Sequence, residues 1–223
     1  MQSQNPKTAI VVGATGLVGK HLTEKLLNDP RYGCVKIFVR RSSCISHPKL
    51  EEYVVDFRLI EKWEDKICGN DLFSALGTTI KKAGSKENQY LVDYTYQYEV
   101  ARAGAVNNIE NYFLVSSVGA NRFSINFYLR IKGALEYSVS QMPFKKIVIF
   151  QPSILVGERE KARIGEKIGS YVANIVTKII PGTVKYRPIK AGIVADAMIN
   201  AANDSIHERI VIYKPEMISV IAE

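Results

Sequence analysis

Three glycines at fixed spacing constrain the fold of this chain more than any other feature. Gly13, Gly16 and Gly19 form a GxxGxxG pattern directly after the short apolar run 7–12. The apolar side chains that follow recur every four residues, as one face of a helix requires: Val18, Leu22 and Leu26. A strand that enters a helix through such a turn brings its backbone close to a bound pyrophosphate, because glycine has no Cβ and the helix N-terminus attracts anions. The pattern predicts a dinucleotide site whose first contacts are Gly13, Thr15, Gly16, Leu17, Val18 and Gly19.

Short apolar runs alternate with helical patterns along the rest of the chain. We expect further strands at 35–39, 53–56, 71–76, 112–116 and 146–150, and helices near 85–105 and 126–140. Strands that are almost continuously apolar indicate a parallel sheet covered on both faces, an α/β doubly wound fold with ligands at the carboxyl ends of the strands. The prediction is a single domain over 1–223, in which 153–223 forms a short carboxyl-terminal substrate-side lobe. That segment is expected to hold helices near 165–178 and 191–203 and a strand at 209–213.

Composition excludes several classes of protein. Of the 223 residues 47% are hydrophobic and 23% are charged, as in soluble globular proteins. No apolar run approaches the roughly 18–20 residues of a membrane helix, and no secretory signal is visible. The sparse cysteines and histidines lack metal-site spacing, so we expect no metal and a reducing, cytoplasmic location. These residues are Cys34, Cys44, Cys68, His21, His47 and His207.

The chain is basic, with 30 Lys and Arg against 22 Asp and Glu, a net charge of +8 and a pI near 9.3. Such a balance suits polyanionic partners, so a nucleic-acid-binding protein is one hypothesis. The basic residues are scattered, however, and are not interleaved with stacking aromatic residues. We therefore expect no nucleic-acid and no membrane partner, and a few of the charges could serve a phosphorylated cofactor.

Two arginines stand where an NAD site usually has an acid. About 20 residues past the last glycine, a carboxylate commonly accepts hydrogen bonds from the ribose hydroxyls. Here that position falls on Arg40 and Arg41. A guanidinium group suits a 2′-phosphate, so the sequence favours NADP over NAD. Further cofactor contacts are expected after the third and fourth strands, at Asp56 toward the adenine and at Leu76, Gly77 and Thr78 toward the ribose.

A tyrosine and a lysine four residues apart are candidate catalytic groups. The chain has three such pairs, Tyr32/Lys36, Tyr128/Lys132 and Tyr186/Lys190, so spacing alone selects none of them. The first pair runs into a predicted strand and the last contains a helix-breaking proline. Tyr128 and Lys132 alone lie on a predicted helix, where positions i and i+4 share a face.

The position of this pair also makes chemical sense. It follows Ser116 and Ser117 at the end of the fifth predicted strand. A neighbouring ammonium favours the phenolate and lowers the tyrosine pKa toward the range that acid–base catalysis needs. Lys132 can also bind ribose hydroxyls, and a serine hydroxyl can orient a substrate carbonyl. Which of the two serines faces the substrate stays open.

Together these motifs resemble the short-chain dehydrogenase/reductase superfamily, in particular its atypical branch of Tat-interacting-protein-like oxidoreductases. The finer matches are 39–41, 54–56, 76–79, 116–120 and 128–133. The resemblance implies an NADP-bound Rossmann fold in which Tyr128 donates or accepts the proton and Lys132 assists it. It also implies that Pro152 and Leu155 approach the nicotinamide and that Arg163 reaches the cofactor phosphates.

Two features depart from the pattern of that superfamily. The helix before the fifth strand shows no clear asparagine of the kind many reductases use in a proton relay. The carboxyl-terminal segment is also shorter than that of the nucleotide-sugar epimerases, so a nucleotide sugar is not expected as the substrate. We therefore expect an NADP-dependent oxidoreductase acting on a small carbonyl or hydroxyl compound. The alternative is a non-catalytic NADPH-binding protein with a regulatory or redox-sensing role, because fold does not guarantee turnover.

Overall fold

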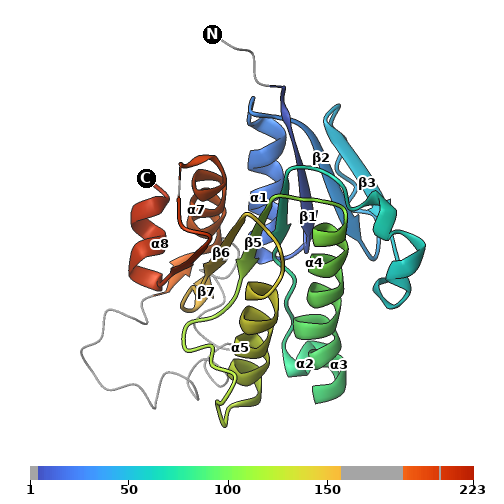
Figure 1. Ribbon diagram of the computed structural model, residues 1–223. Helices are drawn as coiled ribbons and strands as arrows, with labels where there is room; N and C mark the ends of the chain where they lie inside the picture. The colour runs from blue at the N-terminus through green and yellow to red at the C-terminus, as the bar shows by residue number, and fades with distance from the viewer. Residues whose placement is uncertain (1–4, 157–187, 206) are drawn as a thin grey trace.

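The computed structural model describes residues 5–156, 188–205 and 207–223 (Figure 1). Within these residues, seven parallel strands form one sheet in the order β3-β2-β1-β4-β5-β6-β9. Their bounds are β1 Lys7–Val12, β2 Tyr32–Val39, β3 Leu50–Val54, β4 Asp71–Ser74, β5 Asn111–Val115, β6 Lys146–Phe150 and β9 Ile210–Tyr213. A separate parallel pair consists of β7 Leu155–Val156 and β8 Ile189–Lys190. The doubly wound parallel α/β sheet predicted from the sequence is confirmed.

Helices cover both faces of the sheet because its strands are apolar on both faces. In β1, Ala9 and Val11 belong to one buried cluster, and Ile10 and Val12 belong to the other. The first cluster includes side chains of α1 (Leu17–Asn28) and α7 (Ala191–Asn203), and the second includes side chains of α4 (Tyr96–Val106) and α5 (Phe127–Ser140). A last helix, α8 (Pro215–Ile221), packs against α7. None of the helices in the described ranges is long and apolar enough to span a membrane.

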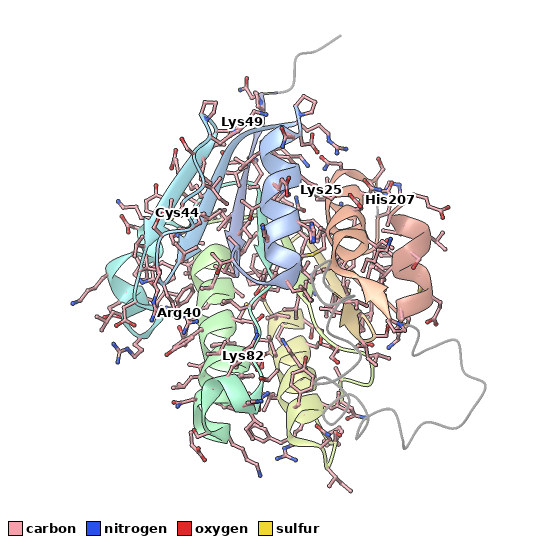
Figure 2. All side chains as sticks on the ribbon, turned by 180° about the vertical axis from the view of Figure 1, so that it is seen from behind. Lys25, Arg40, Cys44, Lys49, Lys82 and His207 are labelled. Carbon is pink, nitrogen blue, oxygen red and sulfur yellow. The ribbon has the colours of Figure 1, made fainter. Side chains whose placement is uncertain are left out.

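The strand order reverses next to β1. The chain proceeds from β1 to β2 and β3 on one side, and then crosses to β4, β5, β6 and β9 on the other. A sheet of this kind opens a crevice at the carboxyl ends of its strands where the order reverses, here between β1 and β4. Lys49, just before β3, and Arg40, just after β2, mark the two opposite ends of the sheet (Figure 2).

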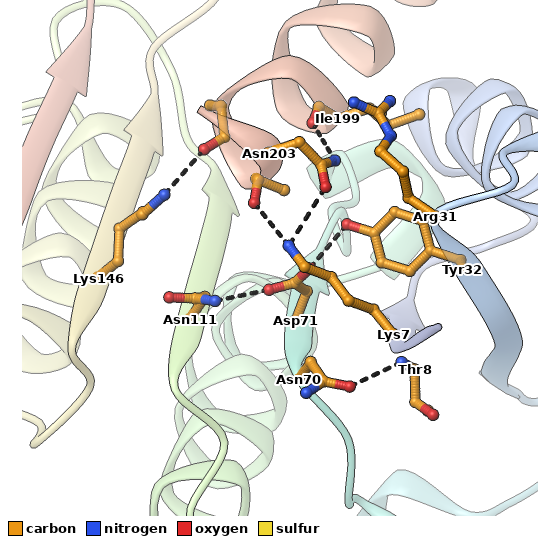
Figure 3. A network of polar contacts seen from close by, with 12 residues as sticks. Lys7, Thr8, Arg31, Tyr32, Asn70, Asp71, Asn111, Lys146, Ile199 and Asn203 are labelled. Carbon is orange, nitrogen blue, oxygen red and sulfur yellow. Dashed lines mark hydrogen bonds and ion pairs between the residues drawn. The ribbon is translucent and has the colours of Figure 1, made fainter. Parts of the chain in front are cut away.

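A buried polar network joins the strands at the amino end, opposite the crevice (Figure 3). The fully buried carboxylate of Asp71 accepts hydrogen bonds from the Tyr32 hydroxyl and the Asn111 side-chain amide, each at 2.7 Å. Lys7 Nζ lies 3.3 Å from the same carboxylate and donates to Asn203 of α7 at 3.2 Å. Four strands and one helix are thus tied together at this end.

Several expected boundaries differ in the structure. The predicted strand 53–56 is β3 at Leu50–Val54, and β4 ends at Ser74 rather than at residue 76. The predicted helix 85–105 is divided into α3 (Lys86–Tyr90), a π-helical turn η3 (Leu91–Thr95) and α4. The helix at 191–203 is confirmed, and the strand expected at 209–213 is β9. The helix expected near 165–178 lies outside the described residues.

The carboxyl-terminal stretch contributes to the core. Of 153–223, β9 is the last strand of the main sheet and α7 packs against α1. The expectation that the whole stretch acts as a substrate-side lobe stays a prediction. The remaining described elements are short: two 3₁₀ turns, η1 (Phe57–Lys62) and η2 (Glu64–Lys66), and the helix α2 (Ile80–Ala83).

Candidate functional site

A cavity of about 730 Å³ opens at the carboxyl ends of β1, β2 and β4, where the strand order reverses. Eight of the predicted cofactor contacts line it, namely Gly13, Thr15, Gly16, Arg40, Asp56, Leu76, Gly77 and Thr78. The structure therefore brings together residues from four separate parts of the sequence that were expected to hold one ligand.

The glycine turn is shaped by close backbone contacts. Gly13 has a φ of +84°, and a Cβ at this position would lie 2.5 Å from the backbone of Ala75, after β4. A Cβ on Gly19 would lie 2.0 Å from the carbonyl oxygen of Gly13, which explains why α1 can begin directly against β1. Gly16 is the N-cap of α1 and carries no side chain to bond the first-turn amides. The free N–H groups and the helix dipole fit an anionic group in this cavity.

Three of the predicted contacts in this turn do not line the cavity. Val18 is buried in the core on the α1 and α7 face of the sheet. Gly19 allows α1 to pack closely against Gly13 and does not line the cavity. Leu17 is half-exposed at the start of α1 and does not line the cavity either.

Arg40 lines the main cavity and also a second hollow of about 540 Å³, which Thr15, Arg41 and Ser42 complete. No acid in the described part of the chain forms an ion pair with Arg40 or Arg41. Glu52 of β3 accepts hydrogen bonds from the Ser42 hydroxyl at 2.6 Å and from the backbone N–H of Ser43 at 2.8 Å. These bonds hold the loop that follows Arg41. Within the described residues, both guanidinium groups thus border this hollow without an ion-pair partner.

Asp56 is the N-cap of η1 rather than the last residue of a strand. Its carboxylate accepts hydrogen bonds from the Arg58 side chain, Nε at 3.0 Å and Nη2 at 2.6 Å, and Arg58 holds the pKa of Asp56 at about 2. Arg58 itself lines the cavity, as do Lys82, Asn88 and Tyr96. Sequence reasoning missed these four because they reach the cavity only through the folding of η1, α2, α3 and α4 around it. Figure 2 shows Lys82 toward the same end of the sheet as Arg40.

Tyr128, Lys132 and Glu136 follow one another at four-residue intervals on α5, which begins after Asn126. The Asn126 side chain caps the helix by accepting from the N–H of Leu129 at 3.2 Å. Tyr128 is half-buried and Lys132 is buried. Lys132 Nζ lies 3.4 Å from Asp93 Oδ1, and the same oxygen accepts from the backbone N–H of Thr78 at 3.4 Å. One carboxylate of the π turn thus connects α5 to the cavity wall.

The two serines after β5 have different surroundings. Ser116 is buried and donates its hydroxyl to Glu136. Gln151 donates to the same carboxylate at 2.9 Å, and burial raises the pKa of Glu136 although both hydrogen bonds oppose the shift. Ser117 is only half-buried, and the backbone of the next residue, Val118, donates to the carbonyl of Pro152 at 2.9 Å. The segment that carries Ser117 is therefore held against the segment that carries Pro152.

The proposed catalytic residues do not themselves line the 730 Å³ cavity. Pro152 is buried, and Leu155 in β7 packs against the core on the α1 side. Arg163 and Tyr186 lie outside the described residues. Tyr32 lies in β2 with its hydroxyl bonded to Asp71, at the opposite end of the sheet from the cavity. In the part of the chain that is described, no group of three or more His, Cys, Asp and Glu side chains is placed to hold a metal ion.

Several solved structures share this fold. A UDP-N-acetylglucosamine 4-epimerase from Methanobrevibacter ruminantium superposes with a TM-score of 0.70 at 17% identity, covering 95% of this chain and 77% of that chain. The Bordetella bronchiseptica enzyme WbmH in complex with NAD⁺ gives 0.69 at 16% identity, with 94% and 75% covered. A short-chain dehydrogenase/reductase superfamily protein from Agrobacterium tumefaciens with bound NAD gives 0.67 at 11% identity, with 93% and 77% covered. At these identities the similarity establishes the fold.

Sequence relatives are nearer. Protein fmp52, mitochondrial, of Aspergillus fumigatus is 34% identical over 200 residues, which cover 86% of this chain and 85% of that protein. Protein FMP52, mitochondrial, of Debaryomyces hansenii is 33% identical over 205 residues and 89% of each chain. No protein-family model matches the chain.

These names overturn one expectation. The cytoplasmic location predicted from the sequence is wrong, since the relatives are named as mitochondrial proteins. Sparse cysteines indicate a reducing environment, which does not distinguish the cytoplasm from a mitochondrial location. At this identity and coverage, the chain belongs to the Fmp52 family.

Proposed function

We propose that this protein is an NADP-dependent oxidoreductase of the short-chain dehydrogenase/reductase type, acting on a small carbonyl or hydroxyl compound. The observation that carries the proposal is the meeting of the glycine turn, Arg40 and the Gly77–Thr78 loop in one cavity at the carboxyl ends of the strands. Solved enzymes of the same fold hold NAD, which supports a nicotinamide dinucleotide as the ligand class. Bound NADPH would supply the hydride.

The choice of NADP follows from charge. Arg40 and Arg41 border the hollow beside Thr15, and each is exposed without an ion-pair partner among the described residues. A 2′-phosphate would receive charge-assisted hydrogen bonds there, whereas the ribose hydroxyls of NAD would find no carboxylate to accept from them. Lys82 adds a further positive charge to the same cavity, whereas Arg58 there is paired with Asp56.

The chemistry is assigned to α5 and the segment after β5. Tyr128 would give its phenolic proton to the substrate oxygen during reduction, and the Lys132 ammonium would stabilise the phenolate that remains. Ser117 is the serine that would orient the carbonyl, because the Ser116 hydroxyl is already donated to Glu136. Pro152 and Leu155 are proposed to approach the nicotinamide.

Cofactor titration tests the proposal. We expect NADPH to bind roughly 10- to 100-fold more tightly than NADH, the value of one charge-assisted phosphate contact. The double variant Arg40→Ala/Arg41→Ala should abolish this preference and leave NADH affinity nearly unchanged. Fluorescence or calorimetric titration measures both affinities.

A charge-matched control removes two cations elsewhere. Lys25→Ala/Lys49→Ala takes two positive charges from positions that lie away from Arg40 (Figure 2) and should keep the preference for NADPH. Equal affinities for the two cofactors in the wild type would overturn the assignment of NADP. Tight NADPH binding without turnover of any aldehyde or ketone in a broad panel would favour a regulatory protein.

A further inference from the structure

One buried carboxylate contacts both the wall of the cofactor cavity and the catalytic helix. Asp93 has no exposed side-chain surface, and its Oδ1 lies 3.4 Å from Lys132 Nζ and 3.4 Å from the backbone nitrogen of Thr78. A Cβ built on Gly77 would lie 3.5 Å from the same oxygen, so the loop passes directly over the carboxylate. Asp93 therefore contacts both α5 and the Gly77–Thr78 loop, and the proposed reaction depends on the relative position of these two elements.

An uncommon backbone feature, a π-helical turn, positions Asp93. Asp93 lies in the π-helical turn Leu91–Thr95, between α3 and α4. Single π turns within helices are rare and often accompany functional sites, because the extra residue redirects a side chain. The turn sends Asp93 toward α5, and the Gln97 amide of α4 bonds the carbonyl of Asp93 at 3.0 Å.

The contacts of Asp93 are poor ones for a structural ion pair. Both distances exceed those of a strong charge-assisted hydrogen bond, and within the described residues Oδ2 has no hydrogen-bond partner. Burial raises the pKa of the Asp93 carboxyl, opposed by Lys132, the Thr78 N–H and the Gln89 side chain. A buried pair of this kind adds little to stability compared with apolar packing, so its presence beside a cavity calls for another role.

We propose that Asp93 is a positioning residue for the reaction, holding the Lys132 ammonium toward the Gly77–Thr78 loop and moderating its charge. The proposal rests on the function proposed above. Among the described residues, the charged or titratable groups near Lys132 are Asp93 from the π turn, and Glu136 and Tyr128 from its own helix. A negative charge on Asp93 offsets part of the ammonium field that favours the Tyr128 phenolate. Asp93 thus sets both where Lys132 reaches and how acidic the phenol becomes.

Two substitutions separate these effects. Asp93→Asn keeps an acceptor oxygen for Lys132 and Thr78 but removes the charge, so NADPH affinity should stay within about twofold of the wild type. Because one negative charge fewer then opposes the ammonium, the phenol becomes more acidic, and the fall of carbonyl reduction at high pH should move to lower pH by about half a unit or more. Asp93→Ala removes the acceptor as well and should weaken NADPH binding by about tenfold.

The matched control is Glu99→Gln on α4, whose carboxylate accepts a hydrogen bond at 2.8 Å from Arg102, which also bonds Glu64 of η2. It should change neither the NADPH affinity nor the pH profile.

If Asp93→Ala does not fold, Asp93→Asn alone decides, because its expected change is in the pH profile. If the wild type binds NADPH without turnover, ¹³C NMR of labelled tyrosine gives the phenol pKa directly, with Tyr128→Phe assigning the resonance.

The outcomes distinguish this inference from the proposed function. A wild-type protein that binds no nicotinamide dinucleotide would overturn both. A wild-type protein that binds NADPH while Asp93→Asn leaves the pH limb or phenol pKa unmoved would overturn the role of Asp93 alone. Unchanged NADPH affinity in a folded Asp93→Ala variant would show that Asp93 does not position Lys132.

Discussion

Tyr128 shows how one residue acquires a proposed role from its surroundings. Tyr32 has a lysine four residues later as well, but it lies in a strand with its hydroxyl bonded to a buried carboxylate. Tyr128 lies on the first turn of α5, one helical turn before a buried lysine. The same spacing thus places one tyrosine in a structural network and the other beside a candidate site.

Replacing the Tyr128 phenol tests its role directly. Tyr128→Phe should lower NADPH-dependent carbonyl reduction by roughly 10²- to 10⁴-fold, the usual contribution of general acid–base catalysis. NADPH affinity should change much less, because the phenol acts mainly in the transition state. Nicotinamide absorbance follows the rate over a panel of small aldehydes and ketones. Tyr137→Phe, on the exposed side of the same helix, is the control and should retain full activity.

At the scale of elements, the decisive contact is that between the start of α1 and the end of β1. Gly19 lies in a helix, yet a Cβ there would lie 2.0 Å from the Gly13 carbonyl oxygen. Gly13 in turn touches the backbone after β4. Helix, turn and neighbouring strand therefore close on one another with no room for a methyl group, and this contact forms the floor of the cavity.

A pair of helical glycines tests this packing. Gly19→Ala should reduce the free energy of unfolding by about 3 kcal/mol, since the backbone must shift to admit the methyl group. Gly192→Ala in α7 is the matched control, because its nearest contact is a His21 ring atom at 4.0 Å. It should be neutral or stabilise by about 0.5 kcal/mol, as alanine favours helix over glycine. Urea unfolding of both variants measures the difference. Equal stability of the two would show that α1 is not packed this closely.

The two ends of the sheet differ: the amino ends of the strands are joined by a buried polar network, and the carboxyl ends border a cavity. The Asp71 network joins β1, β2, β4, β5 and α7 at the amino ends of the strands (Figure 3). At the carboxyl ends the strands instead surround a cavity lined by loops. Polar groups at one end thus serve the architecture, and those at the other are available to a ligand.

This division predicts separable effects on stability and binding. Asp71→Ala leaves the Tyr32 hydroxyl and Lys7 without their buried partner and should cost about 3 kcal/mol of unfolding free energy. NADPH affinity of the folded variant should be unchanged. Asp196→Ala, which breaks the exposed pair with Lys25 at 2.8 Å, should cost less than about 1 kcal/mol. Thermal unfolding and cofactor titration provide the two readouts. A large loss of NADPH affinity in folded Asp71→Ala would contradict the separation of the two ends.

The sequence by itself determined the doubly wound sheet, the glycine turn between β1 and α1, and the helix that carries Tyr128 and Lys132. These features depend on local patterns, since apolar runs and four-residue periodicity report which faces a segment must bury. Arg40, Gly77 and Thr78 could be placed for a related reason. They follow strands, and the carboxyl ends of parallel strands meet at one edge.

Only the tertiary structure decided which polar groups meet across elements. That Asp93 contacts Lys132 depends on a π turn and on the packing of α5 against it, neither of which has a local sequence signature. Segments far apart in the chain also decide that Ser116, and not Ser117, bonds Glu136. The same is true of the approach of Arg58 and Lys82 to the cavity. A hydrogen bond requires two groups within about 3 Å, and no spacing along the sequence encodes a distance between separate elements.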